Sequence, residues 1–395
     1  MMLVLLVWLV AAAATTALGV GAFRLAARLG VAGADDLPAP EWLSLAGWAL
    51  LTAALQVWSL LAPVDGRAQL VFGLGTGLGL LLVRRQWGQL LRRQWPPQWR
   101  APERIGALLG LLLLWLLTFG AQVPINYDVG LYQLQTLQWT EQFAAVPGLG
   151  NLHGRLAFNS SLYLPLALFR VATPAGPAYA LSSYIYALLA VAAVRALVAG
   201  LRAPAPDARR IWAPLLLLLL LVYSFQVWLS SVTPDCTTAA LLVLLFCYYA
   251  QHPPQRATEA QRLLLTLLAA WAVTLKLSAG PVLLLPLYAA WAASGPLAGG
   301  RRWGRPLLLG LLLALPWLAR NVVLSGYLIY PLPAVDVFSV DWKLPVAYAR
   351  MEHNMIVNLA RNSAQSPYAP PQQTLWQWWP NWWAPSRSSN RRWRR

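Results

Sequence analysis

The sequence predicts an all-α integral membrane protein with about ten transmembrane helices. Of its 395 residues, 58% are hydrophobic and only 11% are charged, whereas about a quarter of the residues in a soluble domain are charged. The apolar residues also come in blocks of about 20, the length of helix that crosses a bilayer. The composition therefore argues against a soluble enzyme and against intrinsic disorder.

Ten apolar blocks are expected to cross the membrane. Within the third block, the glycine run 73–79 is expected to allow close packing between helices. Residues 156–169 are too short for a span and contain Pro165, so they are expected to form a helix along the outer interface. The predicted spans are residues 3–23, 42–61, 69–83, 105–122, 178–199, 211–229, 236–250, 258–275, 279–297 and 306–320.

The basic residues predict the orientation. The net charge is +17, and all but two of the 30 basic residues are arginines. Most arginines lie in alternate loops, as the positive-inside rule expects of cytoplasmic loops. Loop 84–104 is then cytoplasmic and loop 123–177 is outside. Acidic residues on the inner side, such as Glu41, are expected to be solvated partners of the arginines. We therefore expect a multi-pass protein of the inner (cytoplasmic) membrane, with membrane lipids and no nucleic acid as partners.

The spans and loops suggest three segments. Residues 1–104 hold three accessory helices and a basic cytoplasmic loop. Residues 105–330 form the transmembrane core with the outer loop 123–177. Residues 331–395 are a short, polar, tryptophan-rich outer tail.

Few residues on the outer side are suited to chemistry. Asp128 follows the fourth span among apolar neighbours, and a carboxylate at such a place favours function. Asp235 follows a proline at a helix start, where a first-turn acid is an equally good explanation. Lys276, Arg320 and Asn321 end spans at the same side. The two cations are suited to a phosphate, although snorkelling and the helix dipole also explain them.

A loop against the membrane adds a second set of candidates. The run 146–159 is rich in polar and turn residues and contains His153 and Arg155 between Asn151 and Asn159. Loops of this kind often carry function. A lone histidine, however, is more often a hydrogen-bonded structural residue.

Three stretches carry a resemblance to a known class. They are Tyr127 to Asn159, residues 274–278 and residues 320–331. Over about residues 105–345 the chain resembles GT-C-type polytopic membrane glycosyltransferases, within a group of poorly characterised bacterial multispanning membrane proteins. The resemblance implies a GT-C-like core with juxtamembrane helices in the first long outer loop.

The resemblance also implies roles for individual residues. Asp128 occupies the position of the essential acid after a span, and Asp235 that of a second acid. A basic residue contacts the lipid-linked phosphate in the class, with Lys276, Arg155 and Arg320 as candidates here. We expect the charged candidates and His153 to converge near the outer surface. The residues expected to bind substrate are Tyr127, Tyr132, Asn151, His153, Arg155, Asn159, Lys276, Arg320 and Asn321.

The expected function is sugar transfer from a polyprenyl-phosphate-linked donor to an acceptor at the outer face of the membrane. Asp128 would be the general base. In an alternative arrangement, Asp128 and Asp235 share a divalent metal ion. Two carboxylates are, however, few ligands for such an ion. The other functions left open are a transporter or flippase of lipid-linked sugars and a non-catalytic envelope assembly protein.

Overall fold

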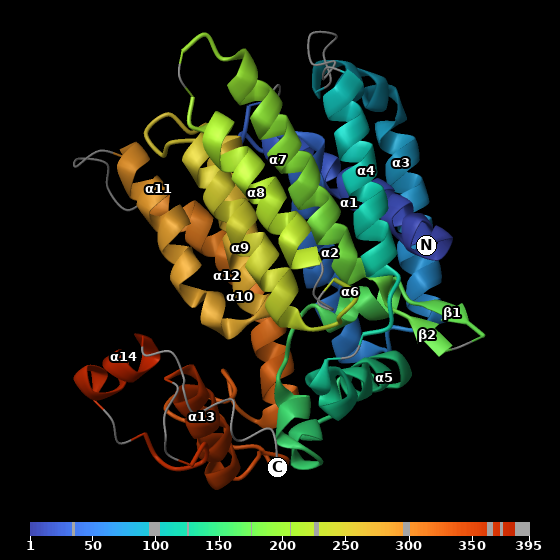
Figure 1. Ribbon diagram of the computed structural model, residues 1–395. Helices are drawn as coiled ribbons and strands as arrows, with labels where there is room; N and C mark the ends of the chain where they lie inside the picture. Colours follow the sequence, from blue (N-terminus) through green and yellow to red (C-terminus); the bar gives the residue numbers. More distant parts are fainter. Residues whose placement is uncertain are drawn as a thin grey trace. The chain divides into compact units, whose positions relative to one another are not determined.

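The computed structural model is mostly α-helical and contains one two-stranded antiparallel hairpin (Figure 1). Residues 95–102 of the predicted cytoplasmic loop 84–104, and all of the segment 384–395, lie outside the described residues. The structure describes residues 1–33, 36–94, 103–124, 126–174, 176–205, 207–224, 229–294, 301–361, 366–371 and 374–383.

The elements follow one another along the chain as helices with a short hairpin in the middle. The N-terminal half holds α1 (Met2–Arg28), α2 (Pro40–Leu61), α3 (Gly66–Gln94), α4 (Glu103–Gly120), η2 (Val129–Gln133), α5 (Leu134–Gln142), η3 (Leu149–Asn151), η4 (Gly154–Ala157), α6 (Tyr163–Leu168), β1 (Val171–Thr173) and β2 (Gly176–Ala178). The C-terminal half holds η5 (Ala180–Ser183), α7 (Tyr184–Arg202), α8 (Arg209–Ser224), α9 (Pro234–Gln251), α10 (Glu259–Leu275), η6 (Leu277–Leu283), α11 (Leu284–Ser294), α12 (Arg301–Ser325), α13 (Val346–Ala360) and α14 (Leu375–Trp383).

The chain divides into two compact units. Unit 1 contains residues 1–145 and 160–317, and unit 2 contains residues 146–159 and 318–395. Unit 1 carries nearly all of the apolar helices and the large hydrophobic core. Unit 2 has a small core of its own around Tyr327 and Tyr330. The three segments expected from the sequence stay a prediction.

Several helices are suited to crossing a membrane. Each of the ten predicted spans coincides with a helix, but only four helices in the described part of the chain are both long and apolar enough. The number ten is therefore not confirmed. One reason is length, because α8 has 16 residues and α10 has 17, fewer than the roughly 20 that span a bilayer. The four are Met2–Arg28, Pro40–Leu61, Ala180–Arg202 and Leu307–Ser325, and shorter apolar helices cover Gly66–Leu82, Ile105–Gly120 and Leu277–Ala292.

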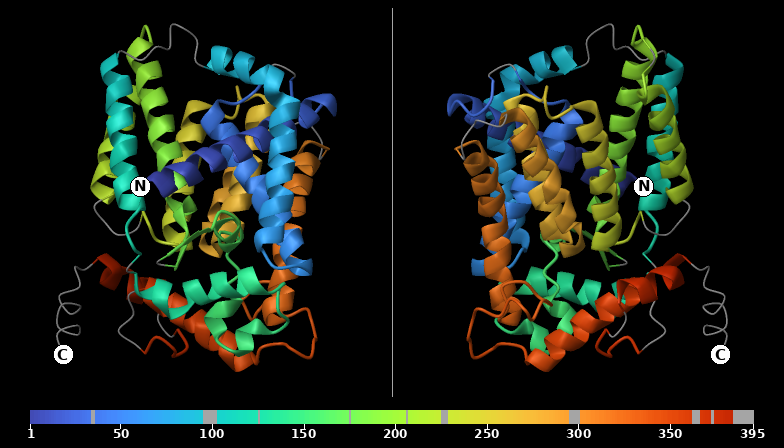
Figure 2. Two further views of the ribbon diagram at one scale, coloured as in Figure 1. Left: turned by 90° about the vertical axis from the view of Figure 1, so that its right-hand side faces the viewer. Right: turned by 90° about the vertical axis from the view of Figure 1, so that its left-hand side faces the viewer.

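The helices α1 and α2 touch backbone to backbone. A Cβ atom added at Gly47 would lie 1.7 Å from the carbonyl oxygen of Thr15, and one at Gly19 would lie 2.0 Å from that of Leu43. The expectation of close packing at the run 73–79 is not met: Gly75 has nothing within 4 Å of an added Cβ. Small residues permit close helix approach, but here they do so at α1 and α2. Figure 2 shows α1 crossing obliquely to the other helices of unit 1.

Buried hydrogen bonds join α1 and α2 to the start of α7. The hydroxyl of Thr15 lies 2.6 Å from that of Ser44, which lies 2.8 Å from the Tyr184 hydroxyl. Trp8 Nε1 donates to the Ser183 hydroxyl at 2.9 Å. Since each of these groups is buried, each would be costly to leave unpaired.

The loops of unit 1 gather at two ends. One cavity is lined by the loop before α2, the α7–α8 loop and the α9–α10 loop. We call this end of unit 1 the Arg-rich end, and it consists of residues 36–39, 199–209 and 251–261. Asp128, Asp235, Lys276 and Tyr163 lie together at what is called the Asp128 end. In Figure 1, α7, α8, α9 and α10 run side by side between these ends. Which of the two ends faces the cytoplasm stays a prediction.

Two expectations are corrected by burial. The stretch 156–169 does not form a helix along an interface, because Leu162, Leu164 and Leu166 at α6 are fully buried in unit 1. Ser160 Oγ donates to the carbonyl oxygen of Leu275 at 2.8 Å, so this stretch completes the end of α10. Glu41 is also buried rather than solvated, and forms an ion pair of 2.9 Å with Arg195.

The contact between α1 and α2 predicts a strong effect of a single methyl group. Gly47→Ala should lower the midpoint of thermal unfolding in detergent, because overpacking typically costs about 1–3 kcal/mol. Gly75→Ala, in the open face of α3, is the matched control and should unfold at or above the wild-type temperature because alanine favours helix. Equal midpoints for the two variants would contradict the backbone contact.

The two ends of unit 1 predict opposite labelling in cells. We expect a membrane-impermeant maleimide to label Gln142→Cys from outside and to leave Ala205→Cys unlabelled until the membrane is opened. The background carries serine at Cys236 and Cys247. Labelling of both positions from the same side of the membrane would refute the predicted orientation.

Candidate functional site

At the Asp128 end of unit 1, two acidic residues that were predicted to belong to the site lie close to one tyrosine. Tyr163 is buried, and burial raises its pKa well above the usual value. Tyr132 and the carboxylates of Asp235 and Asp128 raise the pKa of Tyr163 further. Charges influence a pKa in this way when they lie close by in a poorly solvated place. Asp128 and Asp235 are therefore neighbours of the same phenol, although 107 positions separate them in the printed sequence.

Asp128 stands immediately before a π-helical turn, η2, in the segment after α4. Its amide donates to Asn126 Oδ1 at 3.2 Å. From the same turn, Gln133 Nε2 donates to Thr233 Oγ1 at 3.2 Å, and both side chains are buried. Since Thr233 precedes α9, this hydrogen bond holds the segment of Asp128 beside the segment of Asp235.

Asp235 lies in the first turn of α9, directly after Pro234. A carboxylate is stabilised there by the amide groups at the helix start. Lys276, the residue that follows α10, forms an ion pair with Asp235. The side chain of Lys276 is 43% exposed and that of Asp235 is 56% exposed, so water and ligands reach both. The pair offers an ammonium group that an anion can approach.

The predicted site residues are divided between the two units. Unit 1 contains Asp128, Tyr132, Asp235 and Lys276 near one another, while Tyr127 is 79% exposed. Convergence of all candidates at one site stays a prediction. The remaining candidates belong to unit 2, and they are Asn151, His153, Arg155, Asn159, Arg320 and Asn321.

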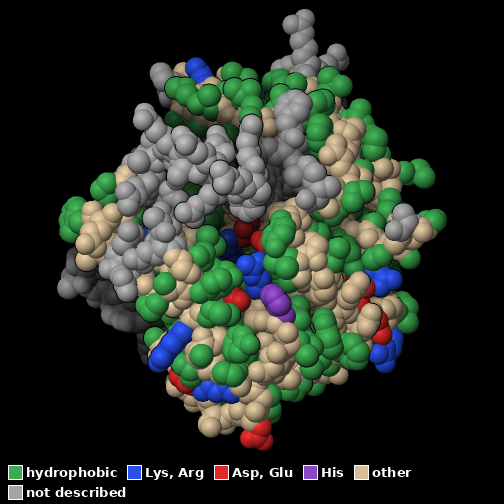
Figure 3. Space-filling model, turned by 60° about the horizontal axis from the view of Figure 1, so that its bottom comes forward, with side chains coloured by type: hydrophobic (Ala, Val, Ile, Leu, Met, Phe, Trp, Pro, Cys, Tyr) green, Lys and Arg blue, Asp and Glu red, His purple; other side chains and the backbone are tan. Residues whose placement is uncertain are grey.

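A second cluster forms within unit 2. His153 Nδ1 accepts from the amide of Arg155 at 3.3 Å, and Arg155 Nη2 lies 3.5 Å from the sulfur of Met355. A Cβ added to Gly154 would lie 3.1 Å from both Glu352 Oε1 and the Tyr330 hydroxyl. Because residue 154 is a glycine, the Glu352 carboxylate and the Tyr330 hydroxyl can pack closely against this loop. Figure 3 shows charged side chains of both signs beside one another, among hydrophobic ones.

Glu352 is a candidate that the sequence analysis missed. It is 6% exposed, and within the described residues neither its Oε2 nor the Tyr330 hydroxyl has a hydrogen-bond partner. Burial raises the pKa of Glu352, while Arg155 and His153 oppose that rise. A buried carboxylate with charged neighbours is a functional candidate. The signal was present in the spacing, because Ala349, Glu352 and Met355 form one buried face of α13.

Several predicted ligand residues have structural partners. Asn151 Nδ2 donates to the carbonyl oxygens of Gly148 at 3.1 Å and Trp342 at 2.8 Å. Asn321 Nδ2 donates to that of Leu328 at 3.0 Å. These amides hold the loops of unit 2. Arg320 is buried, and its Nε has no hydrogen-bond partner among the residues that the structure describes.

The acidic residues of the site provide few ligands for a divalent metal ion. Across the described ranges, no group of three or more His, Cys, Asp and Glu side chains is placed to hold a metal. Asp128 and Asp235 supply carboxylate oxygens, but Asp235 is already paired with Lys276. A hard cation takes six or more oxygen ligands, so most of them would have to come from substrate and water.

Comparisons with known proteins identify the family. The family model described as "Domain of unknown function (DUF8201)" matches residues 1–391. The chain belongs to this family. No curated protein and no solved structure matches the chain.

The buried Glu352 predicts a pH-dependent stability. Its pKa in the folded chain lies above the ordinary 4.5, so the unfolded chain loses this proton first as the pH rises. The free energy of unfolding should therefore fall as the pH increases from about 4.5 through the folded pKa. Glu352→Gln removes this contribution and should be more stable than wild type at pH 7, with the difference shrinking toward pH 4.

Thermal unfolding in detergent between pH 4 and pH 8 would measure this effect. Glu259→Gln changes an exposed carboxylate in the same way and is the control. A difference between Glu352→Gln and wild type that is the same at all pH values would show that the buried carboxylate does not titrate in this manner.

Proposed function

We propose that this member of the family is a membrane glycosyltransferase that transfers a sugar from a polyprenyl-phosphate-linked donor to an acceptor hydroxyl. The main observation behind this proposal is that Asp128 and Asp235 both lie near the Tyr163 phenol. In addition, Lys276 forms an ion pair with Asp235. Groups suited to proton transfer and to phosphate binding at one end of unit 1 support the proposal. The resemblance to GT-C-type enzymes supports the same reading.

In the proposed reaction, Asp128 is the general base. The acceptor oxygen attacks the anomeric carbon while its proton moves to the Asp128 carboxylate. The bond between the anomeric carbon and the phosphate oxygen breaks, and the electron pair leaves with the polyprenyl phosphate. A positioned base of this kind typically contributes 10²–10⁴-fold to the rate.

Lys276 is proposed to bind the phosphate of the donor. Its side chain is 43% exposed although its ammonium group is paired with Asp235. Attraction between an ammonium and a phosphate strengthens as negative charge develops on the leaving group. Asp235 then has the role of holding Lys276 in position, at the start of α9.

The proposed setting is the outer face of the cytoplasmic membrane. The four long apolar helices support embedding in a membrane. The arginine-rich loops lie at the opposite end of unit 1 from Asp128, and the positive-inside rule assigns such loops to the cytoplasm. A polyprenyl donor in the outer leaflet would present its phosphate at the level of the Asp128 end.

Asp128→Asn tests the proposed base. In proteoliposomes supplied with a panel of radiolabelled polyprenyl-phosphate sugars, wild type should move label from at least one lipid into a water-soluble or acceptor-linked product. Asp128→Asn should lose 10²–10⁴-fold of this rate because the amide cannot take the proton. Its thermal unfolding should stay near that of wild type.

Asp65→Asn is the control. Asp65 is also an acid outside the core of the bundle, and its partner is the nearby Arg67. This variant should keep the wild-type rate. Near-normal transfer by Asp128→Asn would remove the catalytic role of this residue. Movement of intact lipid-linked sugar across the bilayer, without cleavage by wild type, would favour a flippase instead.

A further inference from the structure

The Arg-rich end of unit 1 contains a polar cavity remote from the Asp128 end. Its volume is about 210 Å³, and side chains from α2, α7, α8, α9 and the loop before α2 line it. A cavity of this size holds a small polar group rather than a drug-sized ligand. The proposed transfer reaction makes no use of it.

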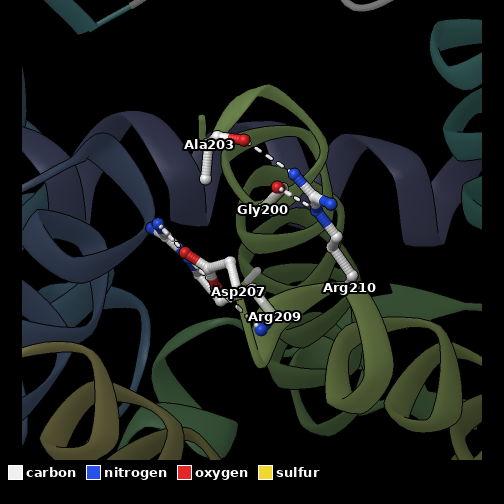
Figure 4. Close-up of polar contacts among 5 residues, drawn as sticks. All are labelled: Gly200, Ala203, Asp207, Arg209 and Arg210. Atoms are coloured by element: carbon white, nitrogen blue, oxygen red, sulfur yellow. Dashed lines mark hydrogen bonds and ion pairs between the residues drawn. The ribbon is translucent and has the colours of Figure 1, made fainter. Parts of the chain in front are cut away.

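One wall of the cavity is basic and rigid. Arg209 is held by Asp207, with Nη2 lying 2.6 Å from Oδ2 and Nε lying 2.9 Å from Oδ1. Arg210 closes the same loop by donating to the carbonyl oxygens of Gly200 at 2.8 Å and Ala203 at 2.6 Å (Figure 4). These contacts fix the α7–α8 loop. The Arg209 side chain is 32% exposed, so a ligand can reach it, and guanidinium donors suit phosphate oxygens.

The basic wall has a second arginine. Arg195 lines the cavity and its Nε lies 2.9 Å from Glu41 Oε1, with side chains 16% and 3% exposed. This buried pair balances its own charge. Of the two arginines that line the cavity, Arg209 is the more exposed, at 32% against 16% for Arg195.

The cavity also contains groups that accept hydrogen bonds. Asp36 lines it and supplies a carboxylate. His252 Nδ1 lies 2.9 Å from the carbonyl oxygen of Tyr248; because that oxygen only accepts, Nδ1 carries the proton and Nε2 of the neutral ring is an acceptor. Burial lowers the pKa of His252, although the nearby Asp36 opposes this.

An aromatic face stands beside these acceptors. The rings of Trp42 and Tyr248 have centroids 4.7 Å apart, and those of Tyr248 and His252 are 4.3 Å apart. All three residues line the cavity. An ammonium group is attracted both by a carboxylate and by the faces of aromatic rings.

The surroundings of the cavity are suited to a lipid. It lies where α2 begins and α7 ends, and both helices are candidate membrane spans. If these helices cross a bilayer, their ends and the cavity would lie at the level of phospholipid headgroups. From Arg209, α8 continues with an exposed apolar face that would lie against acyl chains. The exposed residues of this face are Ile211, Leu215, Leu218, Leu219 and Val222.

We propose that this cavity binds a zwitterion composed of an ammonium and a phosphate, the chemistry of a phosphatidylethanolamine headgroup. The ammonium lies toward Asp36 and the rings of Trp42 and Tyr248. The phosphate lies toward Arg209, and the acyl chains follow α8. The site does not depend on the proposed transferase activity.

Thermal unfolding of the full-length protein in detergent tests the proposal, with lipid stoichiometry followed by native mass spectrometry. Phosphatidylethanolamine should raise the unfolding midpoint by about 2–5 °C, and phosphatidylglycerol should raise it less. Soluble phosphoethanolamine distinguishes the source: a response equal to that of the lipid assigns the site to a soluble zwitterion, and a weaker one assigns it to the lipid.

Asp36→Asn and Arg209→Gln should each abolish the preference for phosphatidylethanolamine over phosphatidylglycerol. Asp65→Asn, at a site that does not line the cavity, should keep it. The proposal is overturned if phosphatidylglycerol stabilises wild type equally, or if both cavity variants respond as wild type does. Native mass spectrometry remains informative where a variant unfolds early, since it counts bound lipid on the folded fraction.

Discussion

The end of α10 is the point on which the arrangement of the Asp128 end depends. A helix that stops in an apolar environment leaves carbonyl groups that must find hydrogen-bond donors. Ser160 donates to the carbonyl oxygen of Leu275, and the Ser161 amide donates to that of Thr274 at 3.0 Å. These bonds draw the segment of α6 into the bundle, where Tyr163 is buried and Asp128 and Asp235 both influence its phenol. The next residue, Lys276, is then free of the helix and turns to Asp235.

The sequence predicts the helices of unit 1 well and their tertiary relations less well. Apolar blocks locate the helices because they depend on local composition, but only four of these helices in the described part of the chain are long and apolar enough to cross a membrane. The burial of α6 was not predictable in this way, since Ser160 and Ser161 resemble the polar edge of an interfacial helix until their partners on α10 are known. The glycines were similarly ambiguous. Gly19 and Gly47 form no regular run in their spans, whereas Gly73, Gly75 and Gly77 of the more regular run have nothing within 4 Å of an added Cβ.

The candidate residues show the same distinction. Asp128 and Asp235 were recognisable from their positions after spans, but their common neighbour Tyr163 is known only from the fold. Glu352 was missed because a glutamate in a polar segment is ordinary, and its burial depends on Gly154 and Tyr330, which are distant in sequence. Asn151 and Asn321, by contrast, have hydrogen bonds that account for them structurally. An amide side chain in a loop does not reveal from sequence whether it binds substrate or backbone.

The contact between α1 and α2 has a mechanical consequence. Where two helices meet through side chains, the side chains can change rotamer and allow sliding. At Gly19 and Gly47 no side chain lies between the backbones, and the hydroxyls of Thr15 and Ser44 fix the register. The two helices therefore behave as one rigid unit. Any motion that admits a substrate to unit 1 must leave this helix pair intact, with the hinges located elsewhere in the bundle.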